Sequence, residues 1–287
     1  MNFNLQQNVS LAPFCSMKAG GNAKYLVQPE SASELAEAIA YFKEKGEKYI
    51  VVGNCSNLLF PDYGYDGAVI ITCGMRKIEE SEGIITAECG VTLSTLARVA
   101  CDASGSGLEF CYGIPGTVGG GVYMNAGAYG GELSQCFISG LFIDESGEFV
   151  EIENGDMDFG YRKSRMNAER LILVSAKFKT EQGDKEVIRA RMDELMTKRK
   201  TSQPLEYPSC GSAFKRPVGH YAGALIEQCG LKGKTIGGAQ VSQKHAGFII
   251  NIGGATSSDV IDLLNFVSET VFNETGVRLE PEIRIIK

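Results

Sequence analysis

A glycine-rich run constrains the fold of this chain more than any other feature. Eight glycines fall between Gly113 and Gly131, among large apolar residues such as Ile114 and Val122. A flexible linker would be polar, and this run is not. It predicts either a backbone that packs closely against a flat or anionic group, or a bend with only a structural role. Exposed N–H groups in tight turns bind anions and suit a pyrophosphate. The run favours a dinucleotide site, with the structural bend as the alternative.

The two common nucleotide-binding motifs are absent from the sequence. No Gly-x-Gly-x-x-Gly occurs anywhere. Gly233-Lys234-Thr235 ends as a P-loop does, but the first glycine of that motif would fall at Gln228. A dinucleotide would therefore need a different fold.

Charge and cysteine content limit the partners. The chain has 287 residues and a net charge of −7. This charge argues against a general binder of nucleic acid or membrane surfaces, because such binding needs a basic face. The segment Met1–Ser10 is polar and unlike a signal peptide, and no apolar run is long enough to span a membrane. Nine cysteines without a C-x-x-C pair favour unpaired thiols in a reducing compartment and no metal site. We therefore expect a cytoplasmic protein.

Alternating strand and helix patterns fill the first part of the chain. Ser31 and Glu34 have capping-box spacing at the start of a helix that Gly46 ends. Tyr49–Val52 reads as a buried strand that leads into a turn. Three further strands are expected at Gly83–Ala87, Phe137–Phe149 and Leu171–Phe178.

The composition of the chain changes near Gln182, so we expect two domains, at 1–182 and 183–287. The first domain should contain two subdomains, at roughly 1–75 and 76–182. Asp184 should cap a helix whose inward face holds Val187, Ile188, Met192 and Leu195. Two more helices are expected at Ala222–Glu227 and Ser258–Asn273, the latter with Val260, Ile261, Leu264, Val267 and Val271 inward. The alternation over Val277–Ile285 predicts a final strand.

Three polar residues are candidates for chemistry, and each has a plainer interpretation. Ser212, between small residues and near Lys215, could transfer a proton or hold an anion, or be an ordinary turn serine. Arg162 could clamp a carboxylate or lie in a solvated turn. Glu282 would by default be a surface carboxylate.

Two further segments are weaker candidates. The turn Gly53–Asn57 could offer backbone donors to a phosphate, although such turns are common. His245 is as suited to packing as to function.

Together these segments resemble the UDP-N-acetylenolpyruvoylglucosamine reductase family over nearly the whole chain, in its shorter subtype. Three runs carry the signature: Gly107–Phe110, Gly113–Gly120 and Met124–Gly131. Other matching segments follow in the family's order: Gly20–Ala23, Gly53–Leu59, Tyr161–Ser164, Pro208–Pro217, Gly230–Gly233, Val241–Asn251 and Leu279–Ile286. The resemblance implies an α+β protein: a two-subdomain FAD-binding module of the vanillyl-alcohol-oxidase type, followed by a C-terminal α/β substrate-binding domain.

The resemblance also implies a reaction, in which NADPH and FAD reduce UDP-N-acetylglucosamine enolpyruvate to UDP-N-acetylmuramate. Ser212 would donate the proton, while Arg162 and Glu282 would stabilise the enol form of the substrate carboxylate. The implied cofactor contacts are Gly53, Asn54, Ser56, Asn57, Gly116, Thr117, Gly119, Gly120, Asn125 and Ala126. The implied substrate contacts are Lys215, Arg216, Gln240 and His245.

Two departures from the family's pattern are Cys55, where glycine is usual, and Lys18, where arginine is frequent. Both histidines lie in the C-terminal part, so we expect FAD to be bound non-covalently. Separately, we expect a monomer. Two rival functions remain: an oxidase of the same fold that ignores NADPH, and a nucleotide-sugar sensor without flavin.

Overall fold

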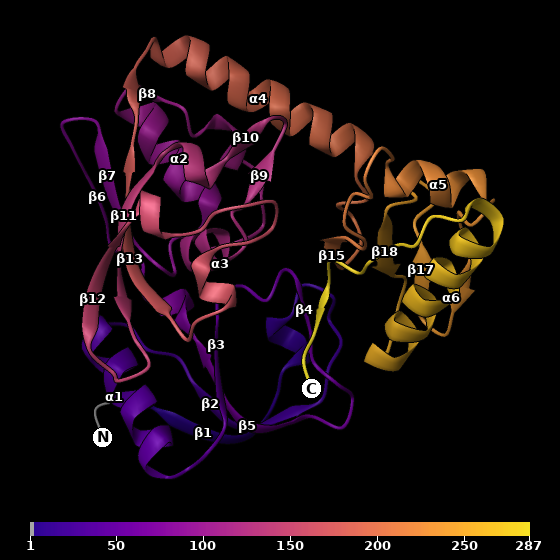
Figure 1. Cartoon of the computed structure of the whole chain (residues 1–287), viewed down its shortest axis with the longest axis horizontal. Coiled ribbons are helices and arrows are strands. Elements are labelled where there is room, and N and C mark those ends of the chain that lie inside the picture. The colour runs from indigo at the N-terminus through magenta and orange to yellow at the C-terminus, as the bar shows by residue number, and fades with distance from the viewer. Residues whose placement is uncertain (1–2) are drawn as a thin grey trace. The chain divides into compact units, whose positions relative to one another are not determined.

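The computed structural model describes residues 3–287, which form two compact units (Figure 1). Unit 1 contains residues up to Gln6, Tyr25–Asn54 and Gly67–Arg199. Unit 2 contains Gln7–Lys24, Cys55–Asp66 and Lys200–Lys287. Each unit has its own hydrophobic core. Within the described residues, no helix combines the length and apolar character that crossing a membrane requires.

Unit 1 is built around a five-stranded antiparallel sheet in the order β12-β11-β13-β7-β6. Its strands are β6 (Ile78–Ser81), β7 (Ile84–Glu88), β11 (Phe137–Ile143), β12 (Phe149–Glu153) and β13 (Ile172–Lys179). Helices α2 (Leu93–Asp102) and α3 (Val118–Tyr123) pack beside it, as Figure 1 shows. Two short pairs complete this part: β8 (Gly105–Ser106) with β14 (Glu181–Gln182), and β9 (Gly127–Ala128) with β10 (Gly131–Glu132).

A second sheet has the order β1-β2-β5-β3. Its strands are β1 (Leu5–Ser10), β2 (Asn22–Val27), β3 (Tyr49–Val52) and β5 (Tyr65–Ile71), and β3 runs parallel to β5. Helix α1 (Ala32–Glu44) begins where the Ser31 side chain accepts a hydrogen bond from the Glu34 N–H. Its predicted apolar face is buried: Leu35, Ala38, Ile39 and Phe42. Burial of one such large side chain contributes about 1.5–3 kcal/mol.

Unit 2 contains an antiparallel sheet in the order β15-β18-β17-β16. Its strands are β15 (Ser209–Ser212), β16 (Thr235–Ile236), β17 (Ala239–Val241) and β18 (Phe248–Asn251). Helices α5 (Ala222–Gln228) and α6 (Ser257–Thr275) pack together, and α6 lies against β16 and β17 (Figure 1). A separate parallel pair joins β4 (Leu58–Leu59) to β19 (Arg284–Ile285). Helix α4 (Lys185–Ser202) runs up to and past the boundary between the units at residue 199.

Most expected elements are present, but four expectations were wrong in detail. Phe137–Phe149 is not one strand, because Asp144 accepts hydrogen bonds from the N–H groups of Gly147 and Glu148 and so turns the chain between β11 and β12. Val187 is 67% exposed, since the buried face of α4 passes through Ile188, Met192, Leu195 and Arg199 instead.

The other two corrections lie at the end of the chain. Leu263 is buried in α6, whereas Ile261 is only half-buried. The final segment is extended, but only Arg284–Ile285 forms a ladder. One reason is Pro281, which has no N–H to donate.

Asp62 anchors the N-terminus of α6. Its carboxylate accepts hydrogen bonds from the N–H groups of Ser257 and Ser258, at 2.7 and 2.8 Å, and from the Ser258 hydroxyl at 2.7 Å. Desolvation by burial raises the pKa of Asp62, but these hydrogen bonds outweigh it and leave the pKa below its usual value. Because the folded-state pKa is depressed, the stabilisation is complete above the unfolded pKa of about 3.9 and is lost as the pH falls below it.

Asp62→Asn should therefore lower the free energy of unfolding by about 0.3–1 kcal/mol at pH 7, the usual effect of losing a negative charge at a helix N-terminus. The difference from the parent protein should shrink as the pH falls below about 3.9. Urea unfolding at several pH values measures this. Asp66→Asn is the control, because that exposed carboxylate makes only a 3.9 Å ion pair with Lys24. A loss for Asp62→Asn that does not change with pH would contradict the assignment.

Candidate active site

The turn after β3 packs against the glycine-rich run. A Cβ on Gly53 would lie 2.2 Å from the Thr117 Oγ1, so only glycine fits there without displacing the threonine. The Asn54 side-chain amide donates to the Pro115 carbonyl at 3.0 Å. Cys55 is buried and has φ +44°, a left-handed conformation that glycine adopts more easily. The departure at Cys55 therefore keeps a glycine-like backbone.

The glycines of α3 differ in how closely other atoms approach them. The Thr117 hydroxyl caps this helix by accepting from the Gly120 N–H, and the Val118 and Gly119 N–H groups donate to the Val91 and Cys89 carbonyls. The expected exposed N–H groups are thus not found at the start of α3. A Cβ on Gly119 would lie 3.1 Å from Cys89, whereas one on Gly120 would meet no atom closer than 3.8 Å. Gly120 therefore leaves an open backbone surface on which a flat group can lie.

Arg162 lies at the tip of a tight turn in unit 1. The backbones of Gly160 and Lys163 hydrogen-bond to each other in both directions, and Arg162 has φ +56°. The buried Asn125 holds this turn, because its amide donates to the Gly160 carbonyl at 3.2 Å. The Ser164 hydroxyl also holds it, by donating to the Tyr123 carbonyl at 2.9 Å. A left-handed arginine costs roughly 1–2 kcal/mol, and such strain is often found at functional sites.

Ser212 and Glu282 lie on neighbouring segments of unit 2. Ser212 ends β15, next to Gly211 at φ +74°, and is exposed. The Glu282 N–H donates to the carbonyl of Ala213, the residue after Ser212, at 2.8 Å. The Asn57 amide donates to the Glu282 carbonyl at 3.0 Å. The structure therefore places Ser212 and Glu282, which are 70 positions apart in the sequence, on neighbouring segments.

Three proposed substrate contacts already have protein partners. Lys215 forms a 3.1 Å ion pair with Glu280, and both side chains are largely exposed. The Arg216 guanidinium stacks 4.0 Å from the ring centroid of Tyr221. The Gln240 amide donates to the Thr235 hydroxyl within the β16–β17 hairpin. Lys215 and Arg216 can exchange these contacts for a phosphate at little cost in free energy, because contacts of exposed cations contribute little to stability.

His245 is half-buried and lies edge-on to Phe248. Its Nδ1 accepts a hydrogen bond from the Gly247 N–H at 3.1 Å, which assigns the ring proton to Nε2. Burial lowers the pKa of His245 below its usual 6.5. The ring is therefore neutral near pH 7 and can offer a substrate an Nε2–H donor rather than a positive charge.

Two of the predicted cofactor contacts have side-chain partners that sequence reasoning did not predict. The Asn125 side chain donates to the Gly160 carbonyl and accepts from the Ser134 N–H. Asn57 received the same assignment, yet its amide faces the Glu282 segment. Nothing in the sequence indicated these partners.

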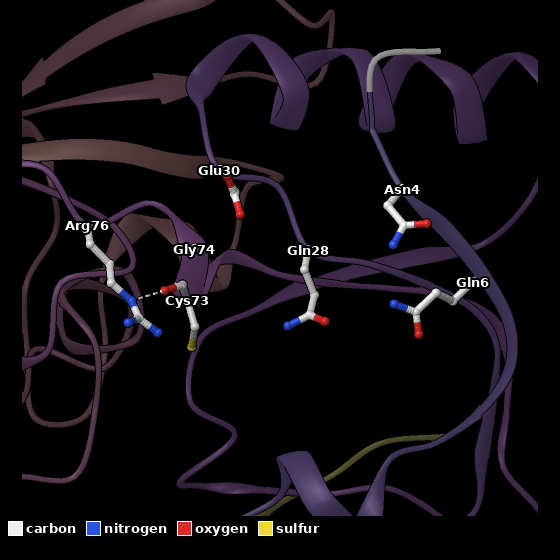
Figure 2. Close-up of a pocket in the computed structure, with 7 residues that line it drawn as sticks. All are labelled: Asn4, Gln6, Gln28, Glu30, Cys73, Gly74 and Arg76. Carbon is white, nitrogen blue, oxygen red and sulfur yellow. Dashed lines mark hydrogen bonds between the residues drawn. The ribbon is translucent and has the colours of Figure 1, made fainter.

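A polar hollow of about 460 Å³ lies elsewhere in unit 1 (Figure 2). Its lining residues are Asn4, Gln6, Gln28, Glu30, Cys73, Gly74 and Arg76. None of them is a predicted site residue. Figure 2 shows side chains that are spread apart, joined only where Arg76 donates to the Cys73 carbonyl. The hollow therefore adds nothing to the candidate site.

Known proteins are similar to this chain over nearly its whole length. An FAD binding domain model matches residues 23–153, and a model of the UDP-N-acetylenolpyruvoylglucosamine reductase C-terminal domain matches residues 203–286. A relative from Caldicellulosiruptor bescii with that reductase name is 48% identical over 278 residues, which cover 96% of this chain and 88% of the relative. One from Lactobacillus johnsonii is 45% identical, covering 99% and 95%. The crystal structure of the reductase from Thermus caldophilus is 34% identical, covers 100% of both chains and has a TM-score of 0.86.

The His245 ring should titrate below pH 6.5, and at neutral pH it should carry its proton on Nε2. Long-range ¹H–¹⁵N NMR during a pH titration measures both, with His245→Gln to identify the signal. Because the folded-state pKa is lowered, stability should fall as the pH drops below about 6.5, and the variant should lose this part of the slope. A proton on Nδ1, or a pKa above 6.5, would contradict the geometry.

Proposed function

The chain belongs to the UDP-N-acetylenolpyruvoylglucosamine reductase family, and we infer that it performs the NADPH-dependent reduction of UDP-N-acetylglucosamine enolpyruvate to UDP-N-acetylmuramate. The family resemblance, the FAD-binding domain and the α+β fold expected from the sequence are confirmed. The product is a peptidoglycan precursor. The chain is therefore a flavin-dependent oxidoreductase, with FAD as cofactor and NADPH as reductant.

The residues present fit FAD. Within residues 3–287, the backbone N–H groups of Asn54, Ser56 and Asn57 have no protein acceptor, so they suit anionic oxygens. Gly120 offers an open backbone surface close to Thr117. Bound FAD supplies hydride transfer from NADPH to the enolpyruvyl methylene carbon. We propose the same ten cofactor contacts as above.

The three proposed catalytic residues have two different roles, proton donation and stabilisation of the enol form. Ser212 donates a proton to the carbon next to the one that receives hydride. Arg162 and Glu282 stabilise the enol form of the carboxylate, where charge develops only in the transition state. Serine is a weak acid, so it can serve only a very basic carbon held in tight geometry. The Glu282–Ala213 hydrogen bond supports this proposal best, because it keeps Ser212 and Glu282 on adjacent segments.

Other features of the proposal rest on the sequence. Lys215, Arg216, Gln240 and His245 are proposed to contact the UDP sugar, with the two cations near its diphosphate. FAD is proposed to be dissociable, since His220 and His245 both belong to unit 2. Nine cysteines, all free thiols, support a cytoplasmic location, and we propose a monomer.

Ser212→Ala should separate the two half-reactions. Reduction of the bound flavin by NADPH should stay within about twofold of the parent, while its reoxidation by the UDP sugar should slow by about 10²-fold or more, the usual effect of losing a general acid. Anaerobic stopped-flow absorbance measures both rates. Ser209→Ala, in the same strand, is the control and should change neither. Near-normal reoxidation in Ser212→Ala would overturn the role of Ser212.

Gly53→Ala should weaken FAD binding by about tenfold or more, because the new methyl group displaces the buried Thr117 side chain and with it the cap of α3. Flavin fluorescence during titration of the apoprotein measures the dissociation constant. Gly155→Ala is the matched control, since its Cβ would meet no atom within 4 Å. Equal affinities in the two variants would show that the Gly53–Thr117 approach is not part of the cofactor site.

A further inference from the structure

Asn57 occupies an unusual place in the parallel pairing of β4 with β19. The Arg284 N–H donates to the Asn57 carbonyl at 3.0 Å, and the Ile286 N–H donates to the Leu59 carbonyl at 2.9 Å. In a regular parallel ladder, the next bond towards the N-termini would run from the Asn57 backbone N–H to the Glu282 carbonyl. The Asn57 side-chain amide makes that bond instead, at 3.0 Å. The side chain thus replaces its own backbone donor.

This substitution has two consequences. Both peptide groups of Glu282 are fixed, because its N–H is bound to the Ala213 carbonyl and its C=O to Asn57. The Asn57 backbone N–H is released from the ladder and has no protein acceptor within residues 3–287. Asparagine suits this position because its short amide can mimic a backbone donor. No apolar side chain could hold Glu282 in this way.

The segment that carries Glu282 needs such a restraint. Glu282 lies outside β19, which contains only Arg284 and Ile285, and irregular backbone is mobile unless it is hydrogen-bonded or packed. A catalytic carboxylate must be held to within roughly 0.5 Å of its working position. Ile283 is buried next to Glu282, which anchors the segment but does not fix the rotation of the Glu282 peptide.

We propose that Asn57 is a positioning residue for Glu282, its side chain holding the Glu282 peptide while its own N–H is left for the cofactor. The proposal rests on the role proposed above for Glu282. It assigns the two asparagines of one turn to different tasks. Asn54 binds the glycine-rich run through the Pro115 carbonyl, and Asn57 binds the Glu282 segment.

Asn57→Asp tests the proposal, because it keeps the shape of the side chain but places an oxygen against the Glu282 carbonyl. Asn54→Asp is the matched control, since it loses a hydrogen bond of the same length in the same turn. In Asn57→Asp, flavin reduction by NADPH should stay within about twofold, and reoxidation at saturating UDP sugar should slow by about tenfold or more, as misplacement of a catalytic group does. The half-saturating sugar concentration should change by less than about threefold, because the altered interaction acts on the transition state. Asn54→Asp should instead weaken flavin binding.

Amide hydrogen exchange provides a measurement that does not depend on the proposed reaction. The Glu282 and Arg284 amides should lose protection in Asn57→Asp but not in Asn54→Asp, while α6 keeps its protection in both. Unchanged exchange, or equal slowing of both half-reactions, would overturn the positioning role. If the parent protein reduces no UDP sugar, the proposed function fails, and the exchange experiment still decides whether Asn57 holds the segment.

Discussion

The backbone hydrogen bonds of the final segment hold Glu282 on a segment next to that of Ser212 within unit 2. The Glu282 N–H binds the Ala213 carbonyl, the Lys215 N–H binds the Glu280 carbonyl, and the Ile286 N–H binds the Leu59 carbonyl. The segment is thereby held against two parts of the chain distant in sequence. Leu279 and Ile283 are buried in the same core, so the apolar and polar restraints act together. These bonds keep the segments that carry Ser212 and Glu282 adjacent.

In unit 1, the backbone at Gly53 packs directly against the Thr117 side chain, which only glycine permits. Gly53 lies against Thr117, and Thr117 caps the helix that contains Gly119 and Gly120. Asn125 then fixes the turn that presents Arg162. Close packing and buried side-chain hydrogen bonds both depend on residue size. Even conservative substitutions of Gly53, Thr117 or Asn125 should therefore disturb the backbone around them.

Local patterns predicted the elements well where local forces decide them. Ser31 caps α1, as its capping-box spacing predicts, and Gly276 ends α6 in a left-handed conformation. Phe137–Phe149 was wrong because its hairpin depends on the Asp144 side chain bonding to the backbone. The partners of Asn57 and Asn125 are 225 and 35 residues away, and no periodicity or spacing encodes such bonds. The family resemblance identified the site residues as candidates, but only the structure shows which side chains hydrogen-bond to the segments that carry them.

The most direct test of the account is the visible absorbance spectrum of the purified protein during anaerobic additions. For a flavin-dependent reductase of this family, we expect a flavin spectrum that bleaches with NADPH and recovers when UDP-N-acetylglucosamine enolpyruvate is added. Recovery with air but not with the sugar would indicate an oxidase of the same fold. A colourless protein that takes up no added FAD would contradict the enzyme assignment and favour a nucleotide-sugar sensor.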